Sequence, residues 1–196
     1  MLLSFARFVS FGLAAAMATA AVPVAAAVDS RDPGRFVDSL AETSFAAIGS
    51  GKSGASRSQF RAILAQHFAV TAIGDRLIQR WRPKISAAQY AQYKSAFPGF
   101  IIGTYADRLA PYASADLKVV RVVPKGSGAA VVTTVTRPGG RPANAIWSVT
   151  KVGGTYKVTN LTVSGVNLGM AQQADFDSTI QRRGFDALVA FMKSRG

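Results

Sequence analysis

"YKVTNLTVSGVNLG", residues 156–169, decides the fold of this chain, because it is a strand whose apolar positions change phase. Tyr156 and Val158 alternate with polar neighbours, as in a half-buried strand. Leu161 and Val163 continue the alternation one residue out of phase. In a regular strand, a shift of one residue would turn the second apolar pair to the opposite face of the sheet.

The phase slip falls at Thr159-Asn160 and is typical of a β-bulge, which inserts one residue into a strand and bends it. Gly165 permits a second sharp bend a few residues later. Two bends in the last strand predict a curved sheet. Helices over a curved sheet can leave a hollow, and we expect the slip to turn Leu161 and Val163 toward it.

Three further β-rich runs precede this segment, at residues 117–124, 129–137 and 144–152. The connections "KGSG", "PGGRP" and "GG" are rich in turn-forming residues and too short for crossover helices. Four strands joined by short turns predict an antiparallel meander.

Helical periodicity covers residues 33–48, 57–81, 86–109 and 171–194, with a flexible break at 49–56. The order of helices, strands and helix indicates an α+β protein. We expect helices packed on a curved, mostly antiparallel four-stranded sheet, with an apolar cavity between.

The N-terminus is typical of an export signal. Arg7 precedes an apolar run from Phe8 to Ala21, and Ala25-Ala26-Ala27 fits the cleavage pattern of small residues. The alternative is a membrane anchor, but the run is shorter than the roughly 20 residues that a spanning helix needs. We therefore predict a signal peptide over residues 1–27 and a single domain over 28–196.

Composition restricts the chemistry and the partners. The chain has no cysteine, which excludes disulfides, thiol catalysis and thiolate metal sites. Its net charge of +13 favours an acidic protein surface or anionic lipid, and export makes nucleic acid the least expected anionic partner.

Three signals could carry chemistry, and each has a simpler explanation. "AAIGSGKS", residues 46–53, matches a loose phosphate-loop pattern, but a segment of helical rather than strand period precedes it. His67 is the only histidine, so it cannot form a metal site with paired ligands. Asp107 stands beside Arg108 and is expected to form a surface pair. We predict no catalytic residues, no metal and no cofactor.

Two segments resemble the MlaC, or toluene-tolerance, family of periplasmic phospholipid carriers. They are "TYADRLAPY", residues 104–112, and residues 156–195. The resemblance extends over essentially the whole chain after the signal peptide, and a hopanoid-associated branch of the same family remains open. The positions that carry it are Phe36, Phe60, Trp81, Phe97, Phe100, Tyr105, Leu109, Tyr156, Val158, Asn160, Leu161, Val163, Gly165, Val166, Asn167, Phe176, Gly184 and Leu188.

The resemblance implies a non-enzymatic carrier that holds a phospholipid by its acyl chains while it crosses the periplasm. It also implies two partners, an outer-membrane lipoprotein complex and an inner-membrane ABC transporter complex with its substrate-binding domain. The residues expected to contact lipid are Phe60, Phe68, Trp81, Phe97, Phe100, Ile101, Tyr105, Val135, Ile146, Leu161, Val163 and Val166.

Two other classes of function remain open at this stage. An exported cone-shaped isomerase or hydratase would act on a small apolar substrate, with a buried base for which His67 and Asp107 are the candidates. A basic adhesion module would have no cavity at all. An ionisable group inside a cavity would favour the enzyme over the carrier.

Overall fold

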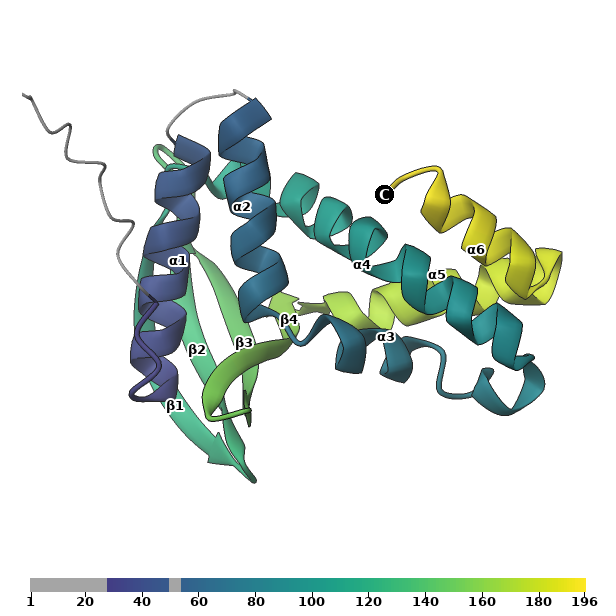
Figure 1. The fold of residues 1–196 in the computed structure, drawn as a ribbon. Helices are drawn as coiled ribbons and strands as arrows, with labels where there is room; N and C mark the ends of the chain where they lie inside the picture. The colour runs from purple at the N-terminus through teal and green to yellow at the C-terminus, as the bar shows by residue number, and fades with distance from the viewer. Residues whose placement is uncertain (1–27, 50–53) are drawn as a thin grey trace, which may run out of the picture.

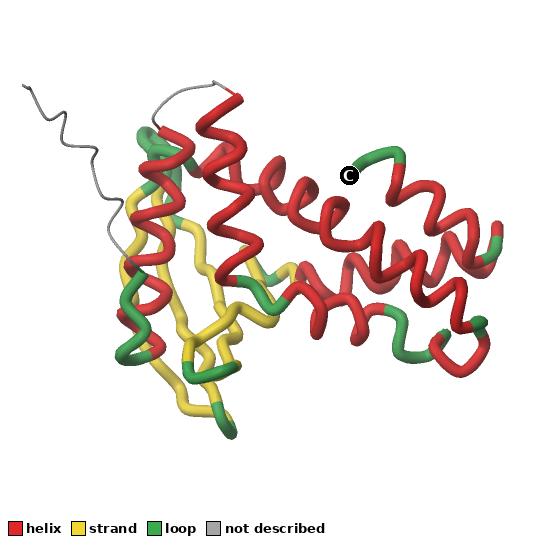
Figure 2. The backbone as a smooth tube through the Cα atoms, in the orientation of Figure 1, coloured by secondary structure: helices red, strands yellow, loops and turns green. Residues whose placement is uncertain are grey.

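The computed structural model describes residues 28–49 and 54–196. The signal peptide predicted for residues 1–27, and Gly51, Lys52 and Ser53 of the phosphate-loop pattern, lie outside these residues. Figures 1 and 2 show a sheet with helices across one face and further helices extending to one side. The elements are α1 (Pro33–Gly49), α2 (Gly54–His67), α3 (Val70–Leu77), η1 (Arg82–Lys84), α4 (Ala87–Leu109), η2 (Ala110–Tyr112), β1 (Asp116–Lys125), β2 (Gly128–Thr136), β3 (Ala143–Val152), β4 (Thr155–Val163), β5 (Val166–Asn167), α5 (Leu168–Arg183) and α6 (Phe185–Lys193).

The sheet confirms the predicted α+β class and the antiparallel meander, since the strands pair in the order β1-β2-β3-β4-β5. The predicted number of four strands was wrong. Ser164 and Gly165 have φ angles of 49° and 83°, as the central residues of a two-residue hairpin turn do. The chain therefore reverses rather than bends, and Val166 pairs with Val163 in a short fifth strand.

The predicted bulge is present in β4. Asn160 pairs with Ser148 and Val158 with Val149, which leaves Thr159 as the extra residue. Its consequence differs from that of a simple phase slip. Because the bulge absorbs the extra residue, Val158 and Leu161 are both buried on the face that packs against the helices, so the apolar positions do not change sides.

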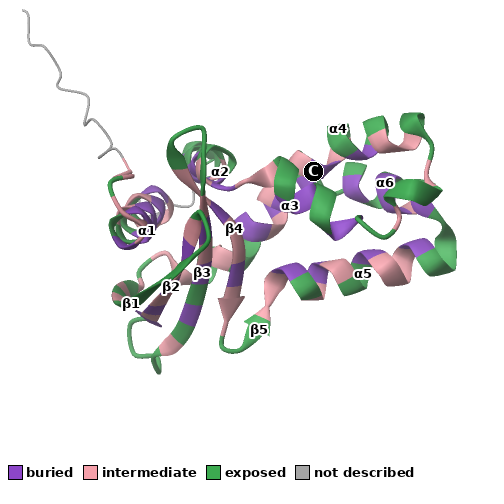
Figure 3. Cartoon of the chain, turned by 90° about the horizontal axis from the view of Figure 1, so that it is seen from below, coloured by how far each residue is buried: buried purple, intermediate pink, exposed green. Residues whose placement is uncertain are grey.

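Helices cover one face of the sheet. α1 and α2 lie across its inner face, and α3 to α6 form a helical lobe beyond its edge (Figure 1). Coloured by burial, each helix presents a buried stripe toward its neighbours (Figure 3). One cluster of buried side chains runs from the sheet through α1 and α2 into this lobe. Within the described residues, no helix combines the length and apolar character needed to cross a membrane.

Two helices predicted as continuous are broken by tertiary contacts or backbone conformation. The helix expected over 57–81 stops at Phe68, because the Ala69 N–H donates to the Val158 carbonyl of β4 at 2.9 Å instead of continuing a helix. The helix expected over 171–194 is interrupted at Gly184, whose φ of 84° is in the left-handed region that favours glycine.

α4 begins where the sequence predicts, directly after Ser86, which caps the helix. The Ser86 hydroxyl accepts from the Gln89 N–H at 3.1 Å, while the Gln89 side chain accepts from the Ser86 N–H at 3.0 Å. This capping box satisfies two of the free amides at the helix start. α4 then runs without interruption through Pro98, and its Tyr93 hydroxyl donates to the Gly74 carbonyl of α3 at 2.9 Å.

Candidate functional site

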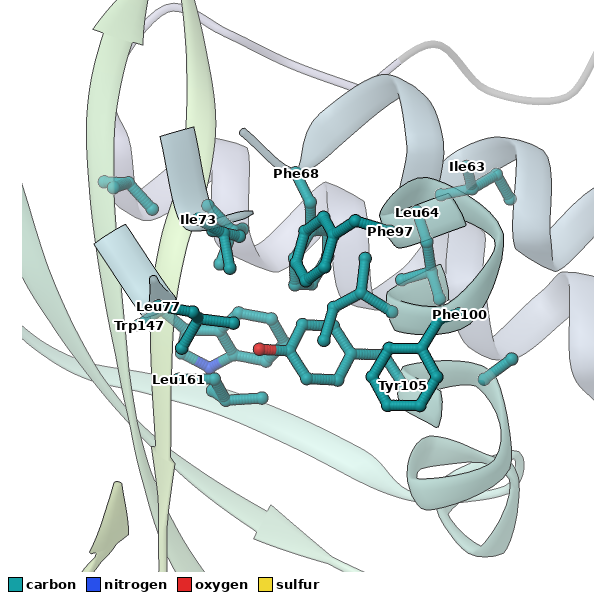
Figure 4. Close-up of a cluster of buried hydrophobic side chains, with 14 of the residues drawn as sticks. Ile63, Leu64, Phe68, Ile73, Leu77, Phe97, Phe100, Tyr105, Trp147 and Leu161 are labelled. Carbon is teal, nitrogen blue, oxygen red and sulfur yellow. The ribbon is translucent and has the colours of Figure 1, made fainter. Parts of the chain in front are cut away.

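An apolar pocket lies between α1, α2 and the inner face of the sheet, closed at one end by the C-terminus of α4 and by η2. Its volume is about 40 Å³. Figure 4 shows some of its lining residues, including Leu64, Phe68, Trp147 and Leu161, within the surrounding cluster of buried side chains. The lining residues are Leu40, Ala41, Ser44, Phe45, Phe60, Leu64, Phe68, Leu109, Tyr112, Val135, Ala145, Trp147, Leu161 and Val163.

The wall contributed by α1 comes from one side of the helix. Leu40, Ala41, Ser44 and Phe45 recur at helical spacing and therefore face the same way. None of them was among the predicted lipid contacts. The only signal in the sequence was an apolar stripe, and a helix that covers an ordinary core has the same stripe.

The wall contributed by the sheet has its polar groups paired away from the pocket. The Trp147 indole N–H donates to the Thr133 hydroxyl at 3.1 Å, and that hydroxyl donates to the Ala145 carbonyl at 3.4 Å. In the strand register Trp147 pairs with Leu161, and Ala145 with Val163. The sheet therefore presents ring and aliphatic surface to the pocket.

Phe68 connects the pocket to the helical lobe. It directly follows α2, forms a β-bridge with Val158 of β4, and its ring lies 5.6 Å from the Tyr105 ring of α4, measured between centroids. Burial raises the pKa of the Tyr105 hydroxyl above its ordinary value of 10.0, so this group is neutral at physiological pH. The Tyr105 hydroxyl therefore adds no charge to this junction.

The structure brings five of the twelve predicted lipid contacts together in the lining. They are Phe60 from α2, Phe68 directly after α2, Val135 from β2, and Leu161 and Val163 from β4. Their contact with lipid stays a prediction, but they share one apolar surface.

The other predicted contacts lie away from the pocket. Trp81 follows α3 and donates its indole N–H to Asp177 of α5 at 2.5 Å. Ile146 and Val166 are 40% and 55% exposed. The remaining four, all buried residues of α4 in or next to the helical lobe, are Phe97, Phe100, Ile101 and Tyr105.

The groups considered for acid–base chemistry are not in the pocket. Within the part of the chain that the structure describes, the pocket lining contains no histidine, carboxylate, lysine or arginine. His67 lies near the Phe36 ring, 6.0 Å between centroids, and burial lowers its pKa below the ordinary value of 6.5, with a smaller contribution from the Lys157 charge. Asp107 is exposed on α4. The expected pair between Asp107 and Arg108 is not found among the ion pairs of the described residues.

The phosphate-loop pattern has a helix on its N-terminal side. Residues 46–49 end α1, whereas a phosphate loop follows a strand. The described half of the pattern therefore lacks the strand that such a site requires.

Comparison with known proteins gives two matches. A family model described as "MlaC protein" matches residues 38–194. A solved structure, a phospholipid-binding protein from Ralstonia solanacearum in complex with a phospholipid, superposes with a TM-score of 0.71 at 20% sequence identity, covering 84% of this chain and 96% of the other. No curated protein matches the chain. At this identity the structural likeness shows a shared fold.

Proposed function

The chain belongs to the MlaC family, and we propose that it is a phospholipid carrier whose apolar pocket holds acyl chains. The solved protein with the same fold is a phospholipid-binding protein in complex with a phospholipid, which supports this assignment. The observation that carries the proposal is the pocket itself, which has apolar walls from α1, α2 and three strands and no charged side chain among its described lining residues.

The energetics explain why a carrier needs such walls. Each methylene hidden from water is worth about 0.8 kcal/mol, so roughly 30 methylenes of a two-chain lipid would cost on the order of 24 kcal/mol to expose. Hydrogen-bonding groups in the wall would gain nothing from acyl chains and would lose their hydration. The Trp147 N–H avoids this loss because Thr133 already accepts it.

Loading requires the pocket to expand. Its volume of about 40 Å³ is far below the roughly 300–1,000 Å³ typical of ligand pockets. The sheet walls are held by strand pairing, whereas α1 and α2 contact the sheet through side chains. We propose that α1 and α2 move away from the inner face of the sheet to admit the chains.

We further propose where the carrier acts. Residues 1–27 would be a cleaved signal peptide that delivers the protein to the periplasm, where it would exchange lipid with an inner-membrane ABC transporter complex and an outer-membrane lipoprotein complex. The family membership supports this proposal. Charge supports it too, since residues 117–174 contain no carboxylate, which suits docking on acidic surfaces.

Native mass spectrometry of the full chain, purified without detergent, tests the proposal. We expect a mass increment that matches a phospholipid and is removed by organic extraction. Protein without this increment that also takes up no lipid from liposomes would contradict the proposal. An isomerase or hydratase would instead need a base, and the described pocket lining offers neither an imidazole nor a carboxylate.

A further inference from the structure

A second cavity lies in the helical lobe, apart from the apolar pocket, where α4, α5 and α6 meet. Its volume of about 420 Å³ is within the range of small-molecule sites. We call it the arginine cleft. Its lining includes Arg108 of α4, Gln172 and Arg182 of α5, and Arg195, which follows α6.

The charges of the cleft are not paired with one another. Within residues 28–49 and 54–196, Arg108, Arg182 and Arg195 form no ion pair, and neither do the two carboxylates of the lining, Asp107 and Asp175. Arg182 donates only to the Ser178 carbonyl of its own helix, at 3.3 Å. Three guanidinium groups and two carboxylates leave the cleft with a net positive charge.

Gln172 is the strongest indication of a ligand. The residue is only 4% exposed and lines the cleft, and no side-chain hydrogen bond ties it to another described residue. Its amide is not among the buried polar atoms that lack a partner, so the amide group itself reaches the open space of the cleft. An amide N–H directed into a cationic cleft can donate to an anion.

A fourth guanidinium approaches the cleft from α2. Gly103 lines the cleft, and the Arg61 Nη2 lies 3.4 Å from the position that a Cβ on Gly103 would occupy. Arg61 Nε is buried without a hydrogen-bond partner in the described residues. The missing side chain at Gly103 therefore leaves room for a cation behind the cleft, which adds to its positive potential.

The cleft also has an aromatic side. The Phe100 ring lies 5.8 Å from Phe176 and 5.6 Å from Phe191, measured between centroids. Phe191 remains substantially exposed although it is a large apolar side chain. A ligand that fits both parts has an anionic group and an adjoining apolar group.

We propose that the arginine cleft is a second binding site, which takes a phosphate ester through Arg108, Arg182, Arg195 and the Gln172 amide. Guanidinium groups bind phosphate through two parallel N–H donors, which a planar fork provides. Such an ester could come from the head group of a lipid or from a soluble phosphate compound. Both present the same anion to the cleft.

Titration of ¹⁵N-labelled full chain with glycerol 3-phosphate tests the site. We expect saturable shifts at the Gln172 side-chain amide, and about tenfold weaker binding in Arg182→Gln. The matched control is Arg183→Gln, which removes the same charge from an exposed neighbour outside the cleft. Lipid carried in the apolar pocket should be equal in both variants, so failure of this site is distinguishable from failure of the carrier.

A parallel experiment with phosphatidylethanolamine vesicles identifies the source of the anion. Vesicle binding that Arg182→Gln weakens and Arg183→Gln does not assigns the site to a lipid head group. Binding of glycerol 3-phosphate without vesicle binding assigns it to a soluble ester. No saturable binding of either probe, or equal loss in the two variants, would overturn the proposal.

Gln172→Leu tests independently whether Gln172 binds a ligand or stabilises the fold. If the amide serves a ligand, an apolar side chain of similar size removes a donor from the cleft and breaks no contact within the protein. We expect the Tm of the ligand-free variant to stay within about 2 °C of that of the unsubstituted protein while phosphate binding falls. A lower Tm with unchanged phosphate binding would show that Gln172 serves the fold and would contradict the proposal.

Discussion

Val163→Glu is the substitution that most sharply separates a lipid-holding pocket from an ordinary core. Val163 is on the inner face of β4, opposite Ala145, and is only half-buried in the pocket lining. In the empty protein, water can reach a carboxylate there. Loss of about half of the valine burial costs about 1 kcal/mol, or about 2–4 °C in Tm.

Bound acyl chains would make the carboxylate at position 163 much less favourable. They would desolvate the carboxylate without pairing it, and an uncompensated buried charge costs about 3 kcal/mol or more. Lipid affinity should therefore fall on the order of 100-fold at pH 8. Because burial raises the pKa of a carboxyl group, lower pH relieves the penalty, and at pH 5 the loss should shrink to less than about tenfold.

The assay compares phospholipid content and Tm at the two pH values. The matched control is Thr162→Glu, which places the same charge on the adjacent residue, whose side chain points to the opposite face of β4. It should keep its lipid at both pH values. Folded Val163→Glu with normal lipid content at pH 8, or equal lipid loss in the two variants, would refute this reasoning. Unfolding of Val163→Glu would show a closed core instead.

Two further predictions concern stability. In Gly169→Ala the added Cβ would lie 2.7 Å from the Asn160 Oδ1, which accepts the Gly169 N–H at 3.2 Å, so we expect urea unfolding to show a loss of about 1–3 kcal/mol. The same change in an Asn160→Ala background should cost much less, and an equal cost would contradict the clash. His67 has a lowered pKa, so the unfolded chain binds a proton that the folded chain does not, and the stability held above pH 6.5 is lost as pH falls below it. His67→Gln should flatten that slope and leave lipid content unchanged, whereas loss of lipid in a stable variant would point to a functional imidazole.

Local signals in the sequence were sufficient to predict the strand order and the β-bulge. Short turns permit only antiparallel neighbours, and the slip at Thr159 is visible because strand periodicity is strict. The face that each apolar pair occupies could not be obtained the same way. It depends on how the partner strand absorbs the extra residue, which is a property of the pair and not of one strand.

The helix breaks and the pocket walls were harder to predict for a related reason. The break after Phe68 comes from a hydrogen bond to Val158, 89 residues further along the chain from Ala69, so no local signal announces it. The α1 wall of the pocket has the same apolar stripe as a core helix. Phe97 of α4 stays a predicted lipid contact, and its ring packs against Tyr93 at 5.3 Å between centroids. Apolar composition does not distinguish a wall that opens from a core that stays closed.

Photolabelling with a phospholipid that carries a diazirine in its acyl chain shows directly which residues contact the bound chains. After loading of the full chain and irradiation, mass spectrometry of peptides locates the adducts. If the apolar pocket holds the acyl chains, we expect adducts at pocket residues such as Leu40, Leu161 and Val163, which come from α1 and from the inner face of β4. Adducts confined to the outer face of the sheet at Ile146, or to the helical lobe at Phe97, would contradict it.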